Sequence, residues 1–345
     1  MPERIEQLHD WLRANLPNHT TPTPPLESVA GDASFRRYFR VKNSNNQSFI
    51  VMDAPPEKED CHPFVEITKA WREQGVLLPE LFAIDLEQGF LLLEDFGDTL
   101  LFQMVDKKPL EEQHSVYTSA IHSLKGIQDL RGAKHLPTYD RALLKRELAL
   151  FTDWLIGTAL HISLTESEQA TIEQSFEALI ESALSQTQCA VHRDYHSRNL
   201  MSLPSGKVGI IDFQDAVFGP VTYDLVSLLR DCYIELNPTL VKELALNYKQ
   251  TSTIEAVREE NEASFLKQFD LMGIQRHMKA AGIFARLALR DGKFGYLNDI
   301  PRTFNYILTQ TARHNELHNL HALLKHRIEQ PMLDFVASHT LEPTQ

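Results

Sequence analysis

Apolar residues recur at every third or fourth position over residues 4–16, which predicts an N-terminal helix. Pro17 ends this helix, and the stretch 20–25 that follows is too rich in proline to continue it. We therefore expect one helix followed by a stiff connector.

From Gly31 to Phe96 the pattern changes to short runs of aromatic, β-branched and leucine residues separated by turn-forming residues, which predicts a small sheet. Apolar residues at helical spacing between the second and third runs predict one helix over residues 62–74. The four expected strands lie within residues 35–41, 48–53, 81–85 and 89–96.

After Gly97 the periodicity is mainly helical, interrupted by two short predicted strands at 189–191 and 207–211. The fold class expected is therefore α+β, with a small β-rich lobe over residues 1–96 and a large, mainly α-helical lobe over residues 97–345. The expected helices cover residues 111–128, 139–160, 165–185, 223–235, 239–250, 262–290 and 302–336.

Composition and charge narrow the classes of function. With 43% hydrophobic and 23% charged residues, the 345-residue chain has the composition of an ordinary globular protein. Its net charge of −13 opposes non-specific binding to nucleic acid and to anionic membranes. We expect neither as a partner.

The sequence contains neither an uninterrupted apolar segment of the secretory kind near its N-terminus nor a run of about 20 apolar residues suited to a membrane span. Its three cysteines are odd in number, widely separated and without CxxC spacing, so we expect reduced thiols. These features predict a cytoplasmic protein.

One segment combines residues suited to phosphate chemistry. Asp194 lies on a predicted loop, Asn199 follows five residues later, and Asp212 leaves the next predicted strand. Carboxylate and amide oxygens are hard ligands, which suit Mg²⁺ together with substrate phosphates. The residues alone therefore indicate a kinase-like phosphotransferase that uses a magnesium nucleotide.

The sequences HRDYHSRN (192–199) and IDFQD (211–215) resemble the signatures of the aminoglycoside phosphotransferase and choline kinase branch of the protein-kinase-like fold. His196 favours this small-molecule branch over protein kinases. The resemblance implies a bilobal fold, with ATP and Mg²⁺ as nucleotide and cofactor. Within the branch, further segments resemble bacterial kinases of cell-wall recycling that phosphorylate the anomeric hydroxyl of amino sugars, which implies N-acetylmuramate or N-acetylglucosamine as acceptor. These segments are 31–41, 51–60, 89–98, 191–201, 210–231 and 275–293.

The resemblance also implies roles for individual residues. Asp194 would accept the proton of the acceptor hydroxyl, and Asn199 and Asp212 would hold Mg²⁺. His192 would brace the segment that carries Asp212. Asp224 would either accept hydrogen bonds from the catalytic-loop backbone or simply favour the start of a helix through its charge.

Residues 31–38 align with the phosphate-binding loop of kinases but lack two of its glycines. The backbone of Gly31, the hydroxyl of Ser34 and the side chains of Arg36 and Arg37 could bind the nucleotide phosphates. The alternative is that both arginines lie at an ordinary exposed strand end.

The strand that in kinases ends in a phosphate-binding lysine has Met52 near that position. We expect Arg36 or Arg37 to replace the lysine, with Glu66 on the lone helix of the small lobe as its acidic partner; otherwise Mg²⁺ neutralises more of the phosphate charge.

The run 91–97 would connect the lobes, with the backbone of Glu94 and Phe96 binding the adenine edge; a buried strand ending in an acidic turn is the alternative. Four further residues are candidates for acceptor binding, although Asp215 could instead cap a turn and 275–277 could be a helix surface. These acceptor candidates are His196, Asp215, Arg276 and His277.

Two other functions remain open. The chain could phosphorylate a different small-molecule hydroxyl, such as that of an aminoglycoside or choline, or it could be a non-catalytic nucleotide-binding module. The second is weakened by Asp194, which a module that only binds nucleotide would not need. We expect a monomer whose partners are ATP and a small amino sugar.

Overall fold

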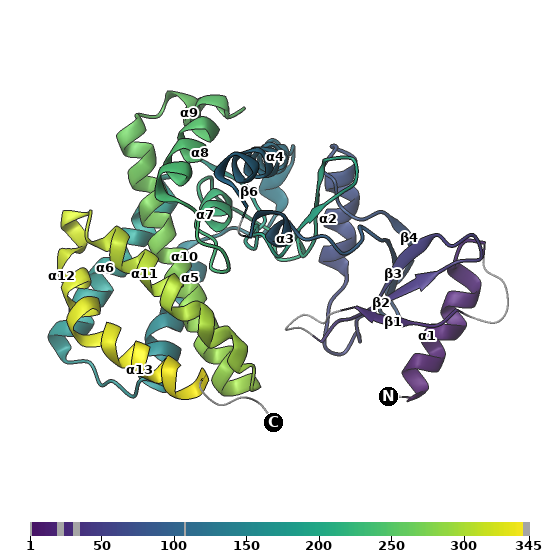
Figure 1. Ribbon diagram of the computed structural model, residues 1–345, viewed down its shortest axis with the longest axis horizontal. Helices are drawn as coiled ribbons and strands as arrows, with labels where there is room; N and C mark the ends of the chain where they lie inside the picture. Colours follow the sequence, from purple (N-terminus) through teal and green to yellow (C-terminus); the bar gives the residue numbers. More distant parts are fainter. Residues whose placement is uncertain (1, 19–23, 30–34, 107, 341–345) are drawn as a thin grey trace. The chain divides into compact units, whose positions relative to one another are not determined.

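The computed structural model describes residues 2–18, 24–29, 35–106 and 108–340 (Figure 1). Its contacts divide the chain into two compact units. The N-terminal unit comprises Met1–Leu100 and Asn199–Asp215, and the C-terminal unit comprises Leu101–Arg198 and Ala216–Gln345. The segment that carries Asn199 and Asp212 thus packs with the N-terminal unit, although most of its sequence neighbours belong to the other.

The N-terminal unit contains a five-stranded antiparallel sheet in the order β1-β2-β3-β5-β4. Four of its strands coincide with the four apolar runs of the sequence, and the short β1 was not predicted because its three residues carry no alternating apolar pattern. The strands are β1 (Glu27–Val29), β2 (Arg37–Lys42), β3 (Ser48–Asp53), β4 (Leu81–Asp85) and β5 (Phe90–Glu94).

Helix α1 (Pro2–Asn15) packs against this sheet, as Figure 1 shows. Leu8 and Leu12 of α1 share a buried cluster with Phe49 and Val51 of β3. Since alternate residues of a strand face opposite sides, this cluster fixes which face of β3 lies under α1. The predicted N-terminal helix is confirmed, and its apolar stripe is the surface that packs on the sheet.

Helix α2 (His62–Arg72) matches the predicted helix of the small lobe. Residues 199–215 pack on this unit through the hairpin of β7 (Leu200–Ser202) and β8 (Val208–Ile210). Phe213, which follows Asp212, is fully buried, with its ring 4.7 Å from Phe64 of α2. A side chain directly beside Asp212 is therefore anchored in the core.

The C-terminal unit is mainly helical and is organised around α10, a 30-residue helix that is buried along most of its length. It packs against α5, α6, α7 and α11. The helices of this unit are α3 (Leu101–Val105), α4 (Leu110–Gln128), α5 (Arg141–Leu150), α6 (Glu166–Ser185), α7 (Tyr223–Leu229), α8 (Pro238–Thr251), α9 (Glu255–Glu259), α10 (Glu262–Asp291), α11 (Ile300–Thr311), α12 (His318–Leu323) and α13 (Glu329–Thr340).

The two strands predicted in the helical region form, but they do not pair with each other. β6 (Gln188–Val191) pairs with β9 (Val217–Pro220) in the C-terminal unit, whereas β8 pairs with β7 in the N-terminal unit. β7 and β9 were not predicted because strands of three or four residues carry too little periodicity.

Two long predicted helices are interrupted. The pattern over 139–160 becomes α5 followed by a π-helical stretch, Phe151–Ala159. The pattern over 302–336 breaks after α11, where His314 is extended and its Nε2 lies 3.2 Å from a carboxylate oxygen of Asp270. Among the described residues, no helix combines the length and the apolar character that a membrane crossing requires.

Candidate active site

The loop between β6 and β7 begins at His192, and Asp224 in the first turn of α7 holds its backbone. The Asp224 carboxylate accepts the backbone N–H of His192 at 2.6 Å and that of Arg193 at 3.0 Å. The Asp194 N–H donates in turn to Nδ1 of His192 at 3.2 Å. Asp224 is therefore placed as an acceptor for the loop backbone, one of the two roles considered from the sequence.

Asp224 is fully buried. Burial raises its pKa to about 7, and the nearby Asp194 charge acts in the same direction, while the two backbone N–H groups oppose the rise. The carboxyl that holds the loop thus titrates near neutral pH.

Asp231 is a second anchor, which the sequence analysis did not identify. Its carboxylate accepts the backbone N–H of Ser197 at 2.9 Å and that of Tyr233 at 2.8 Å, and the residue is fully buried. The only sequence signal is an acid two residues after the end of the apolar run of α7, a pattern that follows many helices.

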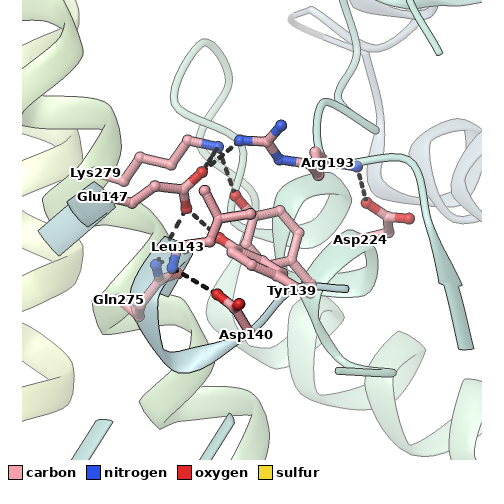
Figure 2. Close-up of polar contacts among 9 residues, drawn as sticks. Tyr139, Asp140, Leu143, Glu147, Arg193, Asp224, Gln275 and Lys279 are labelled. Atoms are coloured by element: carbon pink, nitrogen blue, oxygen red, sulfur yellow. Dashed lines mark hydrogen bonds and ion pairs between the residues drawn. The ribbon is translucent and has the colours of Figure 1, made fainter. Parts of the chain in front are cut away.

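Arg193 connects the loop to a buried charge cluster, shown in Figure 2. Its backbone has a φ of 77°, a left-handed conformation that is uncommon for a residue other than glycine. Its guanidinium forms an ion pair with Glu147 of α5, which also accepts a hydrogen bond from the hydroxyl of Tyr139. Lys279 of α10 lies 3.2 Å from the same carboxylate. Neither Glu147 nor Lys279 was identified from the sequence, because no local motif marks them.

Burial of Glu147 acts to raise its pKa, but the positive charges of Lys279 and Arg193 outweigh burial and the net pKa is lowered. Glu147 is therefore a carboxylate at neutral pH that faces two cations. Such an arrangement fixes the Arg193 side chain and, through it, the strained backbone next to Asp194.

Asp194 is partly buried in the C-terminal unit. Burial acts to raise its pKa, but the positive charge of Lys279, together with that of Arg276, lowers it overall. Asp194 is thus ionised at neutral pH and can accept a proton or a hydrogen bond. His196 lies with its ring 5.1 Å from that of Tyr233, and burial lowers its pKa, so the imidazole is neutral.

Asn199 and Asp212 lie together in the N-terminal unit. Nδ2 of Asn199 donates to a carboxylate oxygen of Asp212 at 3.2 Å, and Gln214 donates to the other oxygen at 2.8 Å. Asp212 has a φ of 64°. An amide and a carboxylate side by side are the oxygen donors that Mg²⁺ binds together with phosphate and water, so this pair fits the ion. Asp215 is exposed at the end of the same segment.

The arginines of the N-terminal unit pair with acids that the sequence analysis did not name. Arg36 forms an ion pair with Glu59 at 3.2 Å. Burial acts to lower the pKa of Arg36, but Tyr38, Glu59 and Asp212 raise it overall. Arg37 pairs with the fully buried Asp53. Both arginines are thus held by carboxylates rather than extended from an exposed strand end.

The other residues expected to bind the nucleotide have different surroundings in the structure. Gly31 and Ser34 lie outside the described residues. Glu66 is exposed on α2. The N–H of Glu94 donates to the Glu80 carbonyl at 2.9 Å, so this N–H is already engaged within the protein. Phe96 is 9% exposed.

Arg276 and His277 are buried in α10, and this corrects the alternative that they form a helix surface. Nε2 of His277 lies 2.8 Å from the Arg230 carbonyl, and its ring stacks on Tyr306 at 4.8 Å. Burial, followed by the charge of Arg276, lowers the pKa of His277 to about 3, so this histidine is neutral. His277 thus contacts other residues of the helix bundle, and its role in acceptor binding stays a prediction.

Among the described residues, no three histidine, cysteine, aspartate or glutamate side chains form a metal-binding group. A site made of one carboxylate, one amide and substrate phosphates does not require such a group.

The sequence family agrees with this chemistry. The model of the phosphotransferase enzyme family matches residues 25–259 of this chain. The chain therefore belongs to the phosphotransferase enzyme family, and the class predicted from its motifs is confirmed.

Two relatives named N-acetylmuramate/N-acetylglucosamine kinase match over almost the whole chain. The protein of Pseudomonas putida is 41% identical over 92% of this chain and 93% of its own length. The protein of Pseudomonas aeruginosa is 40% identical over 93% of this chain and 96% of its own length.

A solved structure with a similar fold is an ethanolamine kinase of Plasmodium vivax. Its TM-score is 0.63 at 12% identity, with 88% of this chain and 86% of that chain covered. The similarity confirms the predicted α+β, protein-kinase-like fold.

Proposed function

We propose that this protein is an ATP-dependent kinase that phosphorylates the anomeric hydroxyl of N-acetylmuramate, N-acetylglucosamine or both in peptidoglycan recycling. The observation that carries the proposal is the identity of about 40% over nine-tenths of the chain to kinases named for these two sugars. The geometry around Asp194 supplies the chemical support.

Asp194 is the proposed proton acceptor. Its pKa is lowered despite burial, so the carboxylate is ionised at neutral pH, and it is held by a loop whose backbone is fixed at His192, Arg193 and Ser197. In the proposed reaction this carboxylate orients the C1 hydroxyl and accepts its proton as the oxygen attacks the γ-phosphorus of ATP. The products are the sugar 1-phosphate and ADP. Positioning and charge neutralisation account for most of the catalysis in such a transfer.

Asn199 and Asp212 are the proposed ligands of Mg²⁺, which would neutralise charge on the nucleotide phosphates. Asn199 and Gln214 each donate a hydrogen bond to the Asp212 carboxylate, and these bonds hold the carboxylate in one orientation. The proposal gives Arg36 a phosphate contact in place of the missing lysine, because it is a partly buried cation that interacts electrostatically with Asp212.

An acceptor panel tests the proposal. Purified protein with ATP and Mg²⁺ is assayed for ADP release with N-acetylmuramate, N-acetylglucosamine, choline, ethanolamine and an aminoglycoside. We expect kcat/KM for at least one of the two amino sugars to exceed that for every other acceptor by about 100-fold or more. A preference for choline or an aminoglycoside would identify a related kinase instead, and the absence of turnover with all five would favour a binding module.

A further inference from the structure

The buried guanidinium of Arg276 stands out among the cations that surround Asp194. The side chain comes from the middle of α10, and the residue is 5% exposed. Among the described residues, its one hydrogen bond goes from NH1 to the sulfur of Cys232 at 3.4 Å, and its Nε lacks a partner. A thiol is a weak acceptor, so most of the donor capacity of this guanidinium is unused.

The neighbouring cations differ because each has a carboxylate partner. Lys279, one turn further along α10, lies 3.2 Å from Glu147 and also donates to the hydroxyl of Tyr223 at 3.1 Å. Arg230 forms an ion pair with Asp270. Arg276 has no ion pair of this kind within the part of the chain that the structure describes.

Two acids interact electrostatically with Arg276, and each already has another role. Both oxygens of Asp231 accept backbone N–H groups, from Ser197 and Tyr233. Asp194 interacts electrostatically with Arg276, but it is the residue that faces the acceptor hydroxyl in the proposed reaction. A buried cation whose N–H groups lack acceptors costs free energy. A carboxylate that accepts hydrogen bonds from two of these N–H groups removes that cost.

The two sugars of the proposed function differ in one group. N-acetylmuramate carries a lactyl ether that ends in a carboxylate, and N-acetylglucosamine has a hydroxyl at that position. Resting on the proposed function, we propose that Arg276 binds the lactyl carboxylate of N-acetylmuramate and thereby determines the preference of the enzyme for the acidic sugar. Planar, bidentate recognition of a carboxylate is the task for which arginine is best suited.

The first test changes the substrate and leaves the protein intact. Wild-type kcat/KM is measured for N-acetylmuramate and for its carboxamide, which keeps the lactyl shape but has no negative charge. We expect a loss of about 10- to 100-fold for the carboxamide, as is typical of a buried charge-assisted hydrogen bond. Equal values for the two compounds would overturn the inference.

The second test changes the arginine. In Arg276→Gln, kcat/KM for N-acetylmuramate should fall by about 10- to 100-fold while that for N-acetylglucosamine changes less than about threefold. Arg276→Lys should show an intermediate loss, because lysine keeps the charge but not the planar fork. The control is Arg290→Gln, which removes an exposed arginine from the last turn of the same helix and should alter neither value.

The outcomes separate this inference from the proposed function. Wild-type protein that phosphorylates neither sugar would contradict the proposed function. Wild-type protein that phosphorylates N-acetylglucosamine alone, or variants that keep the preference for N-acetylmuramate over its carboxamide, would overturn the role of Arg276 and leave the proposed function intact. If Arg276→Gln does not fold, Arg276→Lys and the wild-type comparison still decide.

Discussion

At the scale of single residues, three buried carboxylates hold the loop that carries Asp194. Asp224 and Asp231 accept backbone N–H groups of the loop, and Glu147 binds the Arg193 side chain. Only Asp224 could be anticipated, because it belongs to a motif that the family resemblance supplies. Glu147 lies within α5 and Asp231 lies two residues after the end of α7, places where acids are common, and the contacts that make them important join segments far apart in the sequence.

Removing the charge of Glu147 should destabilise the fold. In Glu147→Gln, Arg193 and Lys279 lose the carboxylate that they share in the interior, and leaving such charges uncompensated costs about 3–5 kcal/mol. Urea unfolding at pH 7.5 measures the loss. The control, Glu177→Gln, removes an exposed partner of Arg141 and should change stability little.

The loss in Glu147→Gln should also depend on pH. Because the folded-state pKa of Glu147 lies below its ordinary value of 4.5, its contribution is present above pH 4.5 and disappears as the pH falls through the folded pKa. The difference in free energy of unfolding between wild type and variant should therefore become smaller at acidic pH. Equal stability of the two proteins at pH 7.5 would show that the cluster does not stabilise the native state.

Asp224 should make the stability of the fold depend on pH in the direction opposite to that of Glu147. Its folded pKa of about 7 lies above the ordinary value of 3.8, so the folded state holds a proton that the unfolded chain releases between these values. The contribution of Asp224 to the free energy of unfolding is fully present below about pH 4. It declines by on the order of 4 kcal/mol as the pH rises to about 7. Relative to wild type, Asp224→Asn should thus be more stable at pH 8 than at pH 5. Urea unfolding at both pH values measures this, and a pH-independent difference would refute the raised pKa.

At the scale of elements, long periodic segments were predictable and short ones were not. The four main strands of the N-terminal sheet, α2 and the 30-residue α10 follow directly from their apolar patterns. β7 and β9 have three or four residues, and they form because long-range pairing with β8 and β6 satisfies their backbone groups. No property of their own sequence fixes those partners.

The close approach of α10 to the end of α5 depends on Gly282. A Cβ built there would lie 2.3 Å from the backbone carbon of Leu150 and 2.4 Å from its oxygen, and a backbone cannot rotate away as a side chain can. Helix propensity alone would favour alanine by about 1 kcal/mol. We expect the clash to outweigh this gain, so that Gly282→Ala destabilises the protein by about 2–3 kcal/mol in urea unfolding.

Gly126 is the matched control for this experiment. It lies within α4, and a Cβ built there meets no atom within 4 Å. Gly126→Ala should therefore raise stability by up to about 1 kcal/mol. If both substitutions stabilise the protein, the packing of α10 against Leu150 is looser than the structure describes.

At the scale of the whole molecule, the net charge of −13 does not describe the surroundings of Asp194. Burial acts to raise the pKa of this residue, and the positive charges of Lys279 and Arg276 lower it overall. The overall charge led us to expect no nucleic acid partner, but it says nothing of the pocket, whose electrostatics depend on residues that only the fold brings together.

The division of the chain into units also follows from long-range contacts. Asn199 and Asp212 belong to the N-terminal unit although Asp194 belongs to the C-terminal one, because the β7–β8 hairpin and Phe213 pack on the small unit. The motif spacing identified all three residues from the sequence. The spacing could not indicate which unit each residue would join, because that depends on which residues the buried Phe213 packs against.

The most direct test of the proposed catalytic role of Asp194 is ³¹P NMR of the product formed from ATP, Mg²⁺ and N-acetylmuramate. For the wild-type protein we predict one new signal from a sugar phosphorylated at C1. For Asp194→Asn we predict a rate at least about 1,000-fold lower, with ATP binding unchanged by calorimetry. Phosphate on any other oxygen of the sugar, or near-normal turnover by Asp194→Asn, would contradict the account.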